Sequence, residues 1–267
     1  GISGVDTKTS TALAHTRLQL ENADMRNRAR ELIFNVKGED LLHLDQPNGV
    51  YAERPDRAEL DERWRALGLA NPGPIPSLGL WAPPRSDDPH LPNVGAMRED
   101  IRVFGWTPLE FARQGLIRFC FTDASDIRGN LSFLAEQVQR ELTRQAREVE
   151  GYPGHLGLAE FPSERFGSLE AFVEWLTDLL DDDVWTASPA GRRWVGRAAA
   201  GTILAFTRRL QGASGRLRGL IRADTTAIAR GPASRDDPAV TVVLLTPLHD
   251  FAQRFVVGTL LAQTFDA

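Results

Sequence analysis

Lysine, cysteine and histidine are scarce in this chain, and each scarcity excludes something. Only two of the 31 Lys and Arg residues are lysines, Lys8 and Lys37. The single cysteine, Cys120, permits no internal disulfide and no cysteine-ligated metal centre, and the five histidines lack metal-ligand spacing. No apolar run approaches the ~18 residues of a membrane-spanning helix, and no secretory signal is present. These absences predict a cytoplasmic protein with no membrane partner.

Excess positive charge is absent as well. The net charge is −5, and 42% of the residues are hydrophobic and 25% charged, which is ordinary for a globular protein with a core. This balance gives no argument for nucleic acid or an anionic membrane as a partner. The Gly-x-Ser-x-Gly pattern of a hydrolase nucleophile elbow is also missing.

The first ten residues, GISGVDTKTS, have the pattern of a phosphate-binding loop that runs into a helix. The pattern departs from G-x-x-x-x-G-K-[ST], because Thr7 replaces the second glycine and Gly1 lies one residue too far from Lys8. Glycines would shape the turn, Lys8 would contact the β- and γ-phosphates, and the Thr9 hydroxyl would bind Mg²⁺. The candidate nucleotide-binding residues are Gly1, Gly4, Val5, Asp6, Thr7, Lys8, Thr9 and Ser10.

The scarcity of lysine favours this interpretation of Lys8. In a chain that otherwise uses arginine, a lysine at the phosphate position suggests a need for a compact ammonium rather than a planar guanidinium. The alternative is an N-terminal turn in which Ser3 or Asp6 caps a helix.

Downstream of the loop, helices and strands alternate. Residues 9–22 have helical spacing, and the apolar run at 32–36 predicts a buried strand that ends in the turn Lys37-Gly38-Glu39-Asp40. An α/β fold is therefore expected, with ligands at the carboxyl ends of its strands. Further predicted elements are helices at 57–67 and 108–113, the latter capped by Thr107, and strands at 78–82, 101–104 and 116–121.

Residues 123–235 show helical spacing instead. Apolar stripes at 131–149, 169–180 and 194–210 predict a small helical bundle inserted into the α/β core. The expected domains are therefore 1–122, the N-terminal part of the core; 123–235, the helical insertion; and 236–267, a strand and helix that return to the core. Cys120, between two phenylalanines, is expected to be a buried strand residue.

Charge is segregated within the predicted insertion. Residues 160–183 contain eight acids and one arginine, whereas residues 190–235 contain ten arginines and one acid, Asp224. The two segments could pair with each other or face solvent. Alternatively, the arginines could track the phosphates of a nucleic acid.

The strongest predicted strand is Ala239 to Leu245. Thr246 is expected to cap the following helix, with Pro247 at its first position. His249, close to this helix start, is interpreted as a structural histidine rather than a catalyst.

Three stretches together resemble the HerA/FtsK-type P-loop ATPases, specifically bacterial HerA-like ATP-binding proteins. The first is the loop GISGVDTKTS. The second is the run Ile33 to Asp40, which resembles the family's second-strand motif Asp-x-x-Gly-Glu, with Asn35 in place of the Asp. The third is VTVVLLTPLHDFAQRFVVGTLLAQTF, which resembles the strand and helix before the family's Walker B strand.

The resemblance implies a RecA-like P-loop core that binds and hydrolyses ATP with Mg²⁺, coupled to movement on DNA, usually in a homo-hexameric ring. It implies that Lys8 and Glu39 are catalytic: Lys8 would contact phosphates, and Glu39 would lie near the γ-phosphate and orient water or metal. Thr9 would hold Mg²⁺. The alternative for Glu39 and Asp40 is a solvated turn with a helix cap.

One departure from the family's pattern concerns the acidic half of the site. Phosphoryl transfer needs a metal-supporting Asp after an apolar strand, but Thr246 and Pro247 follow the strand at 239–245. We expect the Walker B strand, the sensor and any arginine finger to lie beyond Ala267, and this piece alone to bind nucleotide weakly. The alternative function is a non-catalytic scaffold or DNA-binding module that uses the arginine-rich helices.

Overall fold

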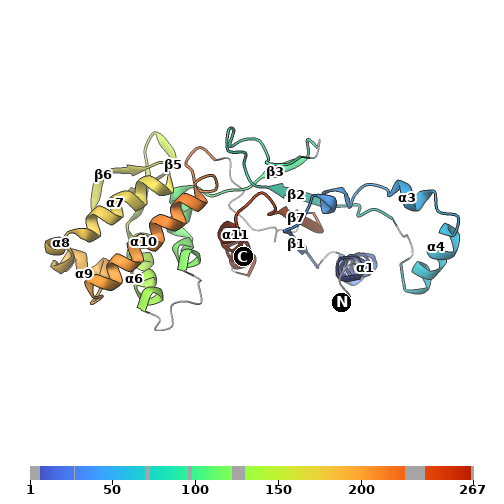
Figure 1. Ribbon diagram of the computed structural model, residues 1–267, viewed down its shortest axis with the longest axis horizontal. Helices are drawn as coiled ribbons and strands as arrows, with labels where there is room; N and C mark the ends of the chain where they lie inside the picture. The colour runs from blue at the N-terminus through green and yellow to red at the C-terminus, as the bar shows by residue number, and fades with distance from the viewer. Residues whose placement is uncertain are drawn as a thin grey trace. The chain divides into compact units, whose positions relative to one another are not determined.

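The computed structural model describes residues 7–26, 28–69, 73–95, 98–121, 130–225 and 238–265, with the backbone alone described for residues 7, 8, 10, 23 and 26 (Figure 1). The described residues form two compact units. The first combines residues from 7–81, 94–101 and 238–246, and the second combines residues from 82–93, 102–225 and 247–265.

The first unit is built on a parallel sheet. The unit contains β1 (Glu31–Asn35), β7 (Val240–Leu244) and all but the last residue of β2 (Leu78–Ala82). The sheet has the order β1-β7-β2-β3, where β3 spans Ile101–Val103 (Figure 1). Strand β7 pairs in parallel with β1 on one side and β2 on the other. All five β7 residues are buried, as expected for a central strand covered on both faces. The strands predicted at 32–36, 78–82, 101–104 and 239–245 are thereby confirmed to within a residue at either end. The burial predicted for 32–36 is wrong, because β1 lies at the edge of the sheet and only Asn35 in it is fully buried.

Helix α1 (Thr7–Glu21) confirms the helix predicted at residues 9–22, with a start two residues earlier and an end one residue earlier. Near the C-terminal end of α1, Leu20 packs against the beginnings of β7 and β2. The Thr16 hydroxyl donates a hydrogen bond to the carboxylate of Glu31, the first residue of β1. Toward the other end, Thr9 lines the same hollow as Phe34, which lies near the end of β1. Side chains from the first and the later turns of α1 therefore line one hollow with β1.

The remaining elements of the first unit are short. The predicted helix at 57–67 is confirmed as α4. One short helix, α2 (Ala23–Arg26), precedes β1. Three short helices lie between β1 and β2 in the sequence: the 3-10 helix η1 (Asp40–His43), α3 (Gly49–Ala52) and α4 (Arg57–Ala66).

The second unit joins helices to a small antiparallel sheet of order β4-β5-β6. Helix α5 begins as predicted: the Thr107 hydroxyl accepts from the Glu110 N–H while the Glu110 carboxylate accepts from the Thr107 N–H, a complete capping box. The elements are α5 (Pro108–Arg113), η2 (Leu116–Phe121), α6 (Asn130–Gln145), β4 (Ala146–Val149), β5 (Tyr152–Leu158), β6 (Phe161–Phe166), α7 (Leu169–Asp181), α8 (Asp183–Ala187), α9 (Pro189–Val195), α10 (Ala200–Leu217) and α11 (Asp250–Phe265).

The strand predicted at 116–121 is wrong. These residues form the 3-10 helix η2, with Leu116, Ile117, Cys120 and Phe121 buried and Arg118 exposed on the opposite side. A short apolar run does not distinguish a buried strand from a buried helical turn, and here the burial recurs at a helical spacing. Cys120 is buried as expected, and burial raises the pKa of its thiol far above the usual range.

The helical prediction for 123–235 is incomplete, because 146–166 form the antiparallel sheet. Val149, placed on a helical stripe, pairs instead with Tyr152 across a hairpin whose loop is Glu150 and Gly151. Gly151 has φ of +76°, a conformation that suits a two-residue hairpin turn. The predicted third helix also divides into α9 and α10, and Gly196 at φ +60° ends α9.

The predicted start of the last helix is wrong as well. Helix α11 begins at Asp250 rather than Pro247, and the Thr246 hydroxyl donates to the Gly38 carbonyl instead of capping a helix. His249 accepts a hydrogen bond from the Phe251 N–H at its Nδ1 atom, 3.2 Å away. This contact at the helix start confirms the structural interpretation of His249. None of the described helices combines the length and apolar character needed to cross a membrane.

Candidate functional site

The carboxyl ends of the parallel strands form one edge of the sheet in the first unit. Asn35 ends β1 opposite Leu244 of β7, and β2 runs in the same direction. Thr9, in the first turn of α1, lines the same hollow as Phe34 near the end of β1. Ligands of α/β sheets bind at the carboxyl ends of the strands.

The candidate phosphate loop is only partly within the described residues. Residues 1–6, which include Gly1, Gly4, Val5 and Asp6, lie outside them. Thr7 is the first residue of α1, followed by Lys8, Thr9 and Ser10 in the first turn, and the Thr9 side chain is exposed. The helix predicted from residue 9 therefore begins two residues earlier, so Thr7 and Lys8 lie within it.

Asn35 shapes the turn that follows β1. Its side chain is buried, the Nδ2 atom donates to the Gly38 carbonyl at 3.1 Å, and the Oδ1 atom accepts from the Lys37 N–H at 3.3 Å. The Thr246 hydroxyl, just after β7, also donates to the Gly38 carbonyl at 3.1 Å. Gly38 has φ of +63°, which glycine adopts without strain. The Asn35 amide thus sets the path of the chain toward Glu39.

Replacing Asn35 with aspartate is expected to lower the free energy of unfolding by about 1–3 kcal/mol at neutral pH, because an ionised carboxylate cannot donate to the Gly38 carbonyl. Protonation restores a donor, so the folded state favours the neutral acid and raises its pKa. The stability of the variant is therefore highest at low pH and is lost as the pH rises through that pKa. Thermal unfolding of both proteins at pH 5 and pH 8 measures the difference. A deficit that is equal at the two pH values would contradict the donor role.

Glu39 lies at the end of this turn and is half-buried. Its Oε1 atom accepts a hydrogen bond from the Gly95 N–H at 2.8 Å. Glu39 directly precedes η1, and its carbonyl accepts a hydrogen bond from the Leu42 N–H. Its side chain makes no capping hydrogen bond to the start of η1. The structure therefore does not show the helix-capping alternative for Glu39, and instead ties its carboxylate to a distant loop.

An ion-pair cluster around the buried Arg98 side chain lies in the same unit as Glu39. Arg98 donates to both carboxylate oxygens of Asp45 at 2.8 Å, to the Asp100 carboxylate and to the Leu42 carbonyl. These hydrogen bonds hold the pKa values of the Asp45 and Asp100 carboxyls below their usual values, against the effect of burial, and they raise that of Arg98. The cluster is therefore fully charged at neutral pH.

The sequence patterns did not indicate Gly95, Arg98 or Thr246 as parts of this edge. Arg-x-Asp occurs also at Arg54 and Arg85, so the pattern around Arg98 does not stand out locally. Arg98 differs from these residues because its side chain is buried and pairs with Asp45, which lies 53 positions earlier in the sequence.

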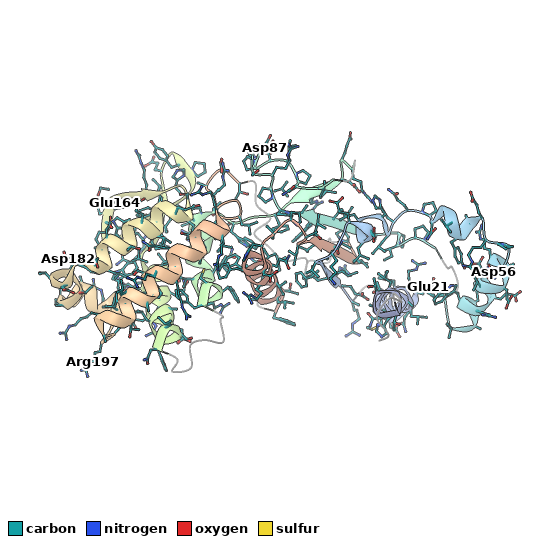
Figure 2. The ribbon with its side chains drawn as sticks, in the orientation of Figure 1. Glu21, Asp56, Asp87, Glu164, Asp182 and Arg197 are labelled. Atoms are coloured by element: carbon teal, nitrogen blue, oxygen red, sulfur yellow. The ribbon has the colours of Figure 1, made fainter. Side chains whose placement is uncertain are left out.

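In the second unit, acidic and basic segments pair as one interpretation expected. Arg193 of α9 pairs with Glu160 at 2.6 Å, and Arg218 after α10 pairs with Glu170 of α7 at 2.7 Å. Arg197, by contrast, is exposed and points away from the helices (Figure 2). Part of the positive charge is thus neutralised within the unit. Arg230 and Arg235 lie outside the described residues.

Among the described residues, no group of three or more His, Cys, Asp or Glu side chains is arranged to hold a metal ion. Comparison with known proteins finds no matching family model and no curated protein with significant sequence similarity. The functional assignment therefore depends on the geometry of the sheet edge.

Proposed function

We propose that the carboxyl edge of this sheet binds the phosphates of ATP and that the protein is an ATPase of the HerA/FtsK-like kind with a RecA-like core. One observation carries the proposal: Thr9, in the first turn of α1 next to Lys8, lines the same hollow as Phe34 and Leu41, which precede and follow Glu39 in the sequence. A helix N-terminus attracts anions, because its first N–H groups are unsatisfied and its dipole is positive there.

Each group at the edge has a distinct role in this proposal. The Lys8 ammonium binds phosphate oxygens, and the Thr9 hydroxyl would hold Mg²⁺, which neutralises phosphate charge when bound. Glu39 orients the attacking water and accepts its proton. The water oxygen bonds to the γ-phosphorus, the bond to the β–γ bridging oxygen breaks, and ADP leaves with that electron pair. The products are ADP and inorganic phosphate.

The exposed Thr9 side chain fits the metal-binding role, and the structure offers a matched control for it. Thr9 and Thr11 are both exposed on the N-terminal part of α1. Thr9→Ala is expected to weaken the Mg²⁺-dependent part of ATP binding by about tenfold or more, whereas Thr11→Ala is expected to leave it unchanged. Equilibrium binding of a fluorescent ATP analogue to the full-length protein, with and without Mg²⁺, measures this. Equal Mg²⁺ dependence in the Thr9 variant and the parent would contradict the assignment.

The resemblance extends the proposal to a cytoplasmic, homo-hexameric ring in which hydrolysis moves DNA. The competing function, a scaffold that binds DNA through the arginine-rich helices, is less well supported, because Arg193 and Arg218 are paired within the unit. DNA binding that depends on salt but not on nucleotide would favour the scaffold. ATP-dependent change in DNA affinity would favour the motor.

A further inference from the structure

Hydrogen bonds join the segment before β3 to Glu39 and to residues that follow it in the sequence. The Gly95 N–H donates to Glu39 Oε1 at 2.8 Å, and three residues later Arg98 donates to Asp45 and to the Leu42 carbonyl. The Gly95 and Leu42 contacts each bridge 56 positions of sequence. The loop is thus fastened both to Glu39 and to the η1 segment that follows it.

The Arg98 anchor is buried, unlike similar pairs elsewhere in the chain. Arg54 and Arg85 each donate two hydrogen bonds to the aspartate two residues later in the sequence, yet both arginine side chains are 48% exposed. The Arg98 side chain is only 8% exposed and binds two carboxylates and a carbonyl. An ion pair whose arginine is buried and held by several acceptors keeps its geometry better than a pair whose arginine is exposed.

We propose that Arg98 and the Gly95 N–H position the Glu39 carboxylate for reaction at the sheet edge. The inference rests on the proposed function, because it assigns a reaction to Glu39. A hydrogen bond from a backbone N–H to an ionised carboxylate is strong and directional, so it restricts rotation of the Glu39 side chain. Arg98 acts through the chain: three peptide units keep Gly95 within ~11 Å of it. Neither residue touches the reacting atoms, so both are positioning residues.

The close approach at Gly95 supports a specific contact. A Cβ atom at this position would lie 3.5 and 3.6 Å from the two carboxylate oxygens of Glu39. Alanine fits at these ordinary contact distances and keeps the N–H. Proline removes the N–H altogether, so it tests the hydrogen bond directly.

The first test compares Gly95→Pro with Gly95→Ala in the full-length protein. The ATPase kcat of the proline variant is expected to be about tenfold below that of the alanine variant, with the KM for ATP the same in both, because misplacing one supporting contact slows chemistry more than binding. Equal kcat values in the two variants would overturn the role of the N–H.

The second test compares Arg98→Ala with Arg54→Ala. Each substitution removes an arginine of the first unit that pairs with the aspartate two residues later. Asp56, the partner of Arg54, is labelled in Figure 2. Arg98→Ala is expected to lower kcat about tenfold at unchanged KM, and Arg54→Ala to have no effect. If Arg98→Ala unfolds the protein, Asp45→Asn, which keeps the size of the partner, takes its place. A folded variant with full kcat would overturn the anchoring role.

Glu39→Gln separates this inference from the proposed function. If Glu39→Gln is inactive while Gly95→Pro and Arg98→Ala keep full kcat, the positioning inference alone fails. If Glu39→Gln hydrolyses ATP at the parental rate, the assigned role of Glu39 fails, and the inference falls with it.

Discussion

Replacing Lys8 with alanine is expected to abolish ATP hydrolysis by the full-length protein, with a loss in kcat/KM of at least about a hundredfold. The reason is electrostatic: Lys8 lies in the first turn of α1, where its ammonium would add to the positive end of the helix dipole on the phosphates. Lys8→Arg keeps the charge but replaces a compact ammonium with a wide, planar guanidinium group. The ATPase activity of this variant is expected to be about tenfold or more below that of the parent. Steady-state phosphate release measures both losses.

Arg65→Ala is the control for the loss of one positive charge. Arg65 is exposed on α4 of the same unit, and its replacement is expected to leave phosphate release unchanged. Unchanged turnover in Lys8→Ala would reject the phosphate-loop assignment. In that case the N-terminal stretch would be a helix-capping turn, as the alternative holds.

The second large effect is expected for Glu39→Gln, with kcat lowered about a hundredfold or more and ATP affinity retained. The amide keeps the size of the side chain and can still accept from the Gly95 N–H, so the loop contact survives. What it loses is the negative charge that would orient the attacking water and take its proton. Single-turnover hydrolysis and binding of the fluorescent analogue separate the chemical step from binding.

The neighbouring residue gives a close control. Asp40 is exposed, directly follows Glu39 and begins η1. Asp40→Asn removes the same charge at almost the same place, yet kcat is expected to stay within about twofold of the parent. Equal losses in Asp40→Asn and Glu39→Gln would point to a general effect of charge at this edge and contradict a specific role for Glu39.

The sequence predicted the parallel sheet well because its signals there are local. The apolar run of β7 needs burial on two faces and is fully buried, and that of β1 is half-buried at the edge of the sheet. The Thr107 cap was equally predictable, since the capping box needs only Glu110 three residues later. The hairpin at 146–158 was missed because its strands mix charged and glycine residues and interrupt an otherwise helical spacing.

The candidate site was predictable only in part. Lys8, Thr9 and Glu39 follow from motif spacing, and the structure adds that Thr9 lines one hollow with Phe34 and Leu41 and that Glu39 accepts from the Gly95 N–H. Thr246 shows where local rules mislead. Its position before Pro247 indicated a helix cap, but its hydroxyl reaches the Gly38 carbonyl, a partner 208 positions away.

By itself, the sequence determined the parallel strands, the start of α5 and the candidate phosphate and acidic residues, because each depends on neighbours within a few positions. Only the tertiary structure decided what Glu39 contacts. Gly95 lies 56 positions from its partner Glu39, and Arg98 lies 53 positions from its partner Asp45. Only the folding of the chain brings each pair together. A hydrogen bond depends on the distance between two atoms in space, and a pattern of residue types does not contain that distance.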